Sequence, residues 1–126
     1  MKYRLKGFTL VELTVSVVIL GILSSIAYVS YHRERRKTEL KGAIAQVQVI
    51  AAAEKNYFMT IGAFVSSGST AQTNTRLNIR IQDAYFRNYQ VASNATAFNV
   101  TVNGGNATYT FNDNGDLSSC AGSDCV

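Results

Sequence analysis

A long run of apolar, aromatic, small and hydroxylated residues extends from Phe8 to Tyr31 near the start of the chain. Glu12 is the only charged residue within it. As an α-helix, this run would be about 36 Å long, which exceeds the roughly 30 Å thickness of a bilayer's hydrocarbon core. The pattern therefore predicts a membrane-spanning helix with one carboxylate near its start.

A second apolar pattern follows at helical spacing, with steps of three, four or seven residues. Its members are Leu40, Ile44, Val47, Ala51, Phe58 and Ile61, and the stripe is widened by Ala43, Ile50 and Tyr57. The chain has no proline, and no strong turn signal separates the two patterns. We expect one continuous helix from about Phe8 to Ile61, without a sharp kink, and with Gly62 as its stop signal.

The remaining residues are polar and rich in turn formers, with short runs of alternating apolar residues. Residues 62–89 are predicted to form a variable loop, with a short strand suggested by the alternation of Leu77, Ile79 and Ile81. Three further strands are predicted at 89–92, 97–102 and 107–111. Residues 103–106, Asn-Gly-Gly-Asn, are typical of the hairpin turn between the last two strands.

Glu12 needs compensation, because a carboxylate in a membrane helix costs roughly 2.5 to 3.5 kcal/mol near the bilayer centre and less near an end. If the chain were cut between Gly7 and Phe8, the new α-amino group would lie one helical turn before Glu12, on the same face. Such a cut would supply a positive partner for the carboxylate.

The basic leader from Met1 to Gly7, followed by Phe8-Thr9-Leu10-Val11-Glu12-Leu13, resembles the processing site of type IV prepilins and their secretion-system relatives. The resemblance implies cleavage after Gly7 by a prepilin peptidase, N-methylation of Phe8, and pairing of Glu12 with the N-terminal amine of a neighbouring subunit. It extends through Gly21 and Tyr31. One departure is Val29, where many members of the family have proline.

This resemblance implies an α+β fold, in which a long N-terminal helix packs on a small antiparallel sheet. Four segments are expected along the chain. They are the leader, residues 1–7; the transmembrane half of the helix, 8–31; its amphipathic half, 32–61; and the variable loop, sheet and C-terminal cysteine loop, 62–126.

The function implied is that of a structural subunit that polymerises into an extracellular pilus. Before assembly, the subunit would span the bacterial inner membrane with its N-terminus in the cytoplasm, where it meets the peptidase, the methyltransferase and the assembly machinery. A pseudopilin of type II secretion, or a minor pilin, is the alternative. A membrane-anchored or secreted binding module is more remote.

An ordinary secretory signal competes with this interpretation of the first segment. Its basic region would be Lys2, Arg4 and Lys6, and it would be cleaved at Ser25-Ile26-Ala27. Glu12 argues against it, because a discarded signal has no use for a carboxylate that interrupts its apolar region.

The formal charge of the whole chain is +4. The leader contributes three positive residues, Lys2, Arg4 and Lys6, so the chain without its leader is left at +1. Nucleic-acid binding is not predicted from so small a surplus. The basic cluster from Arg33 to Lys37 is interpreted as a solvated helix face, with contact to anionic lipid or nucleic acid as the alternative.

Cys120 and Cys125 are the chain's only cysteines, and the residues between them favour a turn. A disulfide is expected outside the cytosol, with two free thiols as the alternative. Residues 113–116, Asp-Asn-Gly-Asp, are typical of a turn, with calcium binding as the weaker interpretation. No catalytic, cofactor or metal-binding constellation is recognised, so an enzyme is not predicted.

Overall fold

The computed structural model describes residues 7–82, 86, 88–123 and 125. Two compact units share the chain, Met1–Arg36 and Lys37–Val126. One helix, α1 (Leu10–Ile61), belongs to both. The prediction of a single continuous helix is confirmed, although α1 begins two residues later than expected. The leader residues 1–6 lie outside the described part of the chain.

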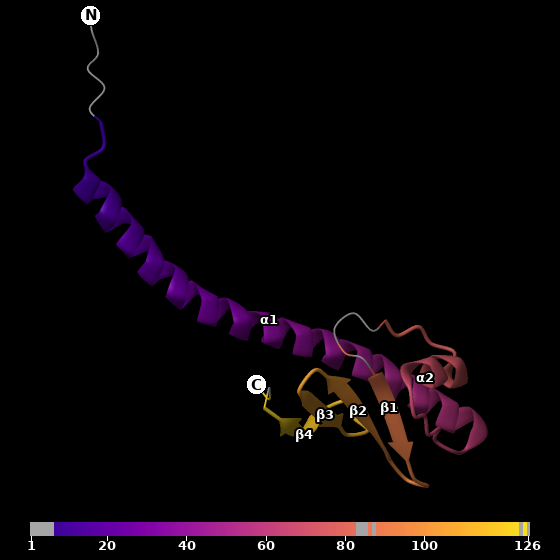
Figure 1. Cartoon of the computed structure of the whole chain (residues 1–126). Helices are drawn as coiled ribbons and strands as arrows, with labels where there is room; N and C mark the ends of the chain where they lie inside the picture. The colour runs from indigo at the N-terminus through magenta and orange to yellow at the C-terminus, as the bar shows by residue number, and fades with distance from the viewer. Residues whose placement is uncertain (1–6, 83–85, 87, 124, 126) are drawn as a thin grey trace, which may run out of the picture. The chain divides into compact units, whose positions relative to one another are not determined.

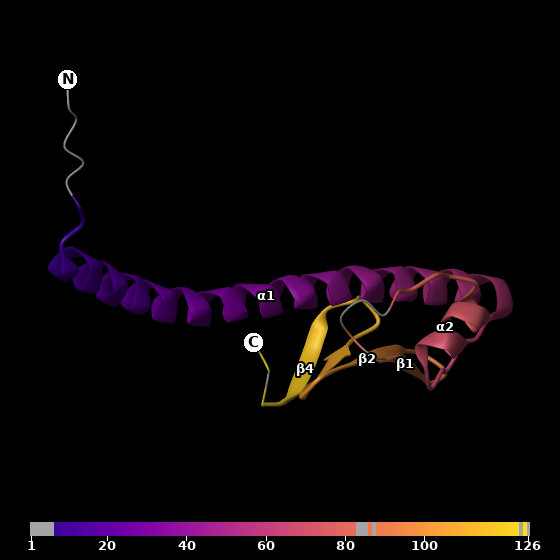
Figure 2. The same cartoon turned by 45° about the horizontal axis from the view of Figure 1, so that its top comes forward.

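The second unit is a four-stranded antiparallel sheet on the second half of α1, accompanied by one short helix (Figures 1 and 2). The strands are β1 (Asn88–Ser93), β2 (Phe98–Gly104), β3 (Ala107–Phe111) and β4 (Leu117–Gly122), and they lie in sequence order. Each strand pairs with the next. This α+β arrangement confirms the predicted fold class.

The core lies between one face of α1 and one face of the sheet. On α1 it uses Ala43, Val47, Ile50 and Ala51, which are 0 to 5% exposed. Alternate positions of three strands face them, as expected for a sheet with one solvated side; these are Tyr89, Val91, Phe98, Val100, Val102, Ala107, Tyr109 and Phe111. The predicted apolar stripe and alternation are therefore confirmed where the two elements meet.

The stripe on α1 was predicted to extend too far. Ile61 is 59% exposed and Phe58 is 37% exposed. The ring of Phe58 stacks on Phe64, with ring centroids 4.4 Å apart, and Phe64 in turn lies 5.2 Å from Phe98. Gly62 ends the helix as predicted, with φ 81° and its N–H donated to the carbonyl of Phe58.

The interval after α1 is more ordered than the predicted loop, because it contains the helix α2 (Thr70–Leu77). Ser69 caps its N-terminus by accepting a hydrogen bond from the N–H of Gln72, whose own side chain accepts from the N–H of Gly68. Asn78 ends it in the left-handed conformation, with φ 52°. The Ser-x-x-Gln spacing and this asparagine are helix signals that the sequence analysis did not use.

The predicted short strand at Leu77, Ile79 and Ile81 is wrong. The side chain of Asn74 takes both backbone groups of Ile81, accepting from its N–H and donating to its carbonyl. Ile81 is therefore buried in the core with its backbone bonded by a side chain rather than by a neighbouring strand.

The fourth strand, β4, was not predicted. It carries no apolar alternation, and its residues are mostly exposed. Its pairing with β3 forms the sheet edge, where Tyr109 lies opposite Cys120. The two turns that precede and follow β3 were predicted correctly, because Gly105 takes the left-handed conformation and Asn112 bonds the backbone of Asn114 and Asp116.

Glu54 is the unexpected member of the core, since it is fully buried. Its Oε2 accepts a hydrogen bond of 3.0 Å from the N–H of Val65, which fixes the chain after α1. Its Oε1 has no hydrogen-bond partner in the described part of the chain. Burial raises the pKa of this carboxyl, and the bond from Val65 opposes that rise only in part.

The raised pKa of Glu54 predicts a pH-dependent stability. The carboxyl of Glu54 holds its proton more tightly in the folded state than in the unfolded state. Its contribution to the free energy of unfolding is therefore complete below the unfolded pKa of about 4.3 and is lost as pH rises through the folded pKa. We expect Glu54→Gln to remove that decline in the free energy of unfolding, while Glu34→Gln, at an exposed site, leaves it in place. Urea titrations across this pH range measure both, and identical slopes in Glu54→Gln and the unmodified chain would contradict the account.

Gly122, at the end of β4, supports a second prediction. Its φ is +126°, and a Cβ there would collide with the backbone of Asn106 and Ala107. Gly122→Ala should lower the free energy of unfolding by at least about 2 kcal/mol, through strain and overpacking. Gly105→Asn is the matched control, because Gly105 has open space around it and a left-handed φ that asparagine tolerates. Equal unfolding midpoints for the two variants would refute the prediction.

Candidate functional site

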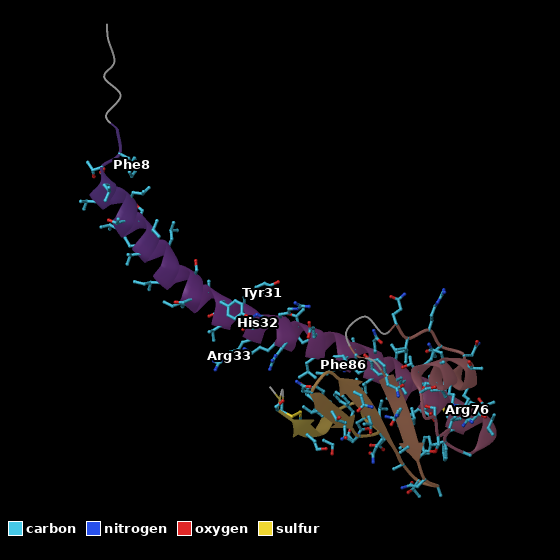
Figure 3. All side chains as sticks on the ribbon, in the orientation of Figure 1. Phe8, Tyr31, His32, Arg33, Arg76 and Phe86 are labelled. Carbon is cyan, nitrogen blue, oxygen red and sulfur yellow. A yellow bond between two sulfur atoms is a disulfide. The ribbon has the colours of Figure 1, made fainter. Side chains whose placement is uncertain are left out.

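The candidate site is the start of α1, where the predicted processing and assembly residues lie together. Gly7, Phe8 and Thr9 precede the helix, and all three are exposed. The peptide bond between Gly7 and Phe8 therefore lies in non-helical, accessible chain. Figure 3 shows Phe8 just before the first turn of α1. Phe8 does not occupy the helix, so its nitrogen is not on the helical face that the sequence analysis assumed.

Thr9 and Glu12 form a reciprocal cap at this end of α1. The Oγ1 of Thr9 accepts from the N–H of Glu12 at 3.2 Å. The Oε2 of Glu12 accepts from the N–H of Thr9 at 3.1 Å and from its Oγ1 at 2.9 Å. This is a capping box, in which residues at the N-cap and N3 positions each satisfy a backbone N–H of the other.

The cap explains how a carboxylate is held in a fixed place at the entrance to an apolar helix. Within the described part of the chain, the carboxylate of Glu12 accepts hydrogen bonds from Thr9 alone, and both reach Oε2. Glu12 remains exposed, so Oε1 is available to a cation from outside the chain. Glu12 also lies in the first turn, where the helix dipole favours negative charge.

The apolar surface that follows Glu12 is uncovered. The large apolar side chains from Phe8 to Tyr31 are 51 to 78% exposed, and the helix is apolar and long enough to cross a membrane on length and composition. Figure 3 shows side chains projecting on every side of this part of α1.

Four aliphatic hydroxyl groups in the apolar run donate hydrogen bonds within the helix. Those of Thr14 and Ser25 donate to carbonyls three residues back, and those of Ser16 and Ser24 donate to carbonyls four residues back, at 2.7 to 2.9 Å. No hydroxyl donor in this group therefore requires water. Such internal bonding is what a helix surrounded by hydrocarbon needs.

The two cysteines lie far along the chain from this site. Cys120, in β4, forms a disulfide with Cys125, with Cα atoms 5.9 Å apart. Cys120 also packs against the hydrophobic core. The bond therefore ties the end of the chain to the edge of the sheet. Among the described residues, no group of three or more His, Cys, Asp or Glu side chains is placed to hold a metal ion.

Comparison with known proteins bears on the N-terminal segment most directly. The family described as "Prokaryotic N-terminal methylation motif" matches residues 3–28. Two proteins from Pseudomonas aeruginosa named "Fimbrial protein" are each 34% identical over 68 residues, which cover 54% of this chain and 44% of theirs. A "Fimbrial protein" from Neisseria meningitidis serogroup A is 26% identical over 98 residues, covering 75% and 58%.

The matched region thus spans only about half the length of these relatives. No solved structure matches the chain significantly. The motif includes Gly7, Phe8 and Glu12, the residues on which the resemblance to prepilins was based. The methylation motif, the fimbrial relatives and a long helix whose second half packs on a small sheet all support the resemblance of this chain to type IV pilins.

Proposed function

We propose that the chain is the structural subunit of a pilus filament, released for assembly by cleavage between Gly7 and Phe8 and by N-methylation of Phe8. The observation that carries this proposal is the capping box of Thr9 and Glu12, which stands at the entrance of an apolar helix that the chain itself does not cover. Pilins are in general structural proteins rather than enzymes.

The geometry at the start of α1 suits both cleavage after Gly7 and pairing of Glu12. The bond after Gly7 lies outside the helix, where a peptidase can bind it in extended form. Thr9 keeps its backbone N–H after cleavage, so the cap that orients Glu12 survives processing. The new amine on Phe8 of one subunit is then a cation that suits the exposed carboxylate of Glu12 on another.

The same proposal accounts for the uncovered apolar surface. In the inner membrane, lipid tails would cover it, with residues 1–7 on the cytoplasmic side. In the filament, the helices of neighbouring subunits would replace the lipid. The charged pair of Glu12 and an amine lowers the cost of leaving a carboxylate in that apolar environment.

The sheet and α2 would then lie on the outer side of the membrane, consistent with the disulfide between Cys120 and Cys125. We assign residues 62–126 to this outer part, and residues 32–61 to the half of the helix that supports it. A lone binding module would have no need of Glu12, whereas a filament subunit depends on its charge.

The test is Glu12→Gln in the native host. Glutamine preserves the capping box, because its Oε1 accepts the same hydrogen bonds, but it removes the charge. We expect membrane insertion and leader removal to continue while surface filaments disappear. Mass spectrometry of the membrane fraction and electron microscopy of sheared filaments measure the two results.

Glu34→Gln is the matched control, since it makes the same chemical change at an exposed position beyond the apolar run; it should leave assembly intact. Thr9→Ser retains the hydroxyl and should also assemble. Normal filaments from Glu12→Gln would refute the pairing of Glu12 with a neighbouring amine.

A further inference from the structure

One further surface of the first unit has a composition that suggests a ligand. Tyr28, Val29, His32, Arg33 and Arg36 line an open recess of about 410 Å³ on one side of α1. Their spacing of three to four residues places them on one helical face. The recess combines the side chains of Tyr28 and Val29, at the end of the apolar run, with the basic groups that follow the run.

His32 contacts two tyrosine rings, of which Tyr28 lines the recess and Tyr31 does not. The imidazole of His32 meets the ring of Tyr28 edge-on, with centroids 4.4 Å apart, and that of Tyr31 at 6.0 Å. Tyr28 and Tyr31 are nevertheless 67% and 66% exposed. Figure 3 shows Tyr31, His32 and Arg33 close together on this part of α1.

We propose that the recess formed by Tyr28, His32, Arg33 and Arg36 binds the phosphate headgroups of anionic phospholipids before the subunit is assembled. This inference rests on the proposed membrane-bound stage of the chain. Tyrosine prefers the boundary between hydrocarbon and water, where its ring is apolar and its hydroxyl is wet. Arginine matches a phosphate by forming several directed hydrogen bonds.

The spacing along α1 supports this position. At 1.5 Å per residue, Tyr28 to Arg33 lie about 24 to 32 Å along the helix from Glu12. The hydrocarbon core is about 30 Å thick. If Glu12 lies near one boundary of the core, the recess lies at the other, among the headgroups.

The proposed binding gives the recess a role that a solvated helix face lacks. Headgroup contacts at Tyr28 to Arg36 would fix how deep α1 sits, and therefore hold Glu12 near the cytoplasmic boundary. Arg36 already interacts within the chain, as do Glu34, Arg35, Lys37 and Glu39. Arg33 is therefore the residue on which the test is built.

The experiment uses the full chain in nanodiscs of equimolar phosphatidylglycerol and phosphatidylcholine. Native mass spectrometry after release measures the ratio of the two lipids that remain bound. For the unmodified chain, we expect phosphatidylglycerol to be favoured. Arg33→Gln should reduce that preference about five-fold, as expected for one basic residue beside an anionic surface. Arg33→Lys keeps the charge but loses the forked donors of the guanidinium group, so it should restore only part of the preference.

Arg35→Gln is the matched control, because it makes the same change at an exposed arginine two residues away that does not line the recess. The proposal requires that this variant, and added inorganic phosphate, leave the preference unchanged. An equal fall in Arg35→Gln would show diffuse attraction to the anionic surface, and displacement by inorganic phosphate would show a free-anion site; either result would overturn the proposal. An unchanged preference for phosphatidylglycerol in Arg33→Gln would also overturn the proposal. These failures concern lipid alone, since the filament proposal depends on the assembly of Glu12→Gln.

Discussion

The apolar surface of α1 between Phe8 and Tyr31 is exposed within its own unit and has to be covered, and the proposed function follows from this constraint. The large apolar side chains there are more than half exposed, while the hydroxyls of Thr14, Ser16, Ser24 and Ser25 are bonded within the helix. Hydrocarbon or other copies of the same helix satisfy such a surface equally well. Under the proposed function, lipid would cover this surface before assembly and neighbouring helices would cover it afterwards, and the carboxylate of Glu12 would guide the change by pairing with an amine of another subunit.

The second unit solves a different problem, which is to form a stable head from few residues. One face of α1 and one face of a four-stranded sheet bury a common core, so neither has to fold alone. Polar side chains bind backbone groups that are not paired within the sheet. Glu54 binds the backbone after α1, and Asn74 takes the place of a strand beside Ile81. The disulfide between Cys120 and Cys125 then holds Cys125 to the edge of the sheet.

The features that could be predicted from the sequence are those that depend on the spacing of apolar residues or on short motifs. The length of α1, its stop at Gly62 and the alternation of β2 and β3 were all evident in the sequence. β4 was not, because its position depends on hydrogen bonds to β3 rather than on its own side chains. The burial of Glu54 was also missed, since a glutamate on an amphipathic helix is normally solvated. At the candidate site, Glu12 was recognised, but its capping partner Thr9 was overlooked, although Thr-x-x-Glu is a known helix-start signal.

The central claim is that the chain acquires a new, methylated N-terminus at Phe8 from which assembly proceeds. The most direct measurement is the intact mass and N-terminal sequence of the protein isolated from its native host. The account predicts a chain that lacks residues 1–7, begins at N-methylated Phe8 and retains the disulfide. A chain that begins at Met1 would identify a plain membrane anchor, and one that begins at Tyr28 would identify a discarded secretory signal. Either result would contradict the account.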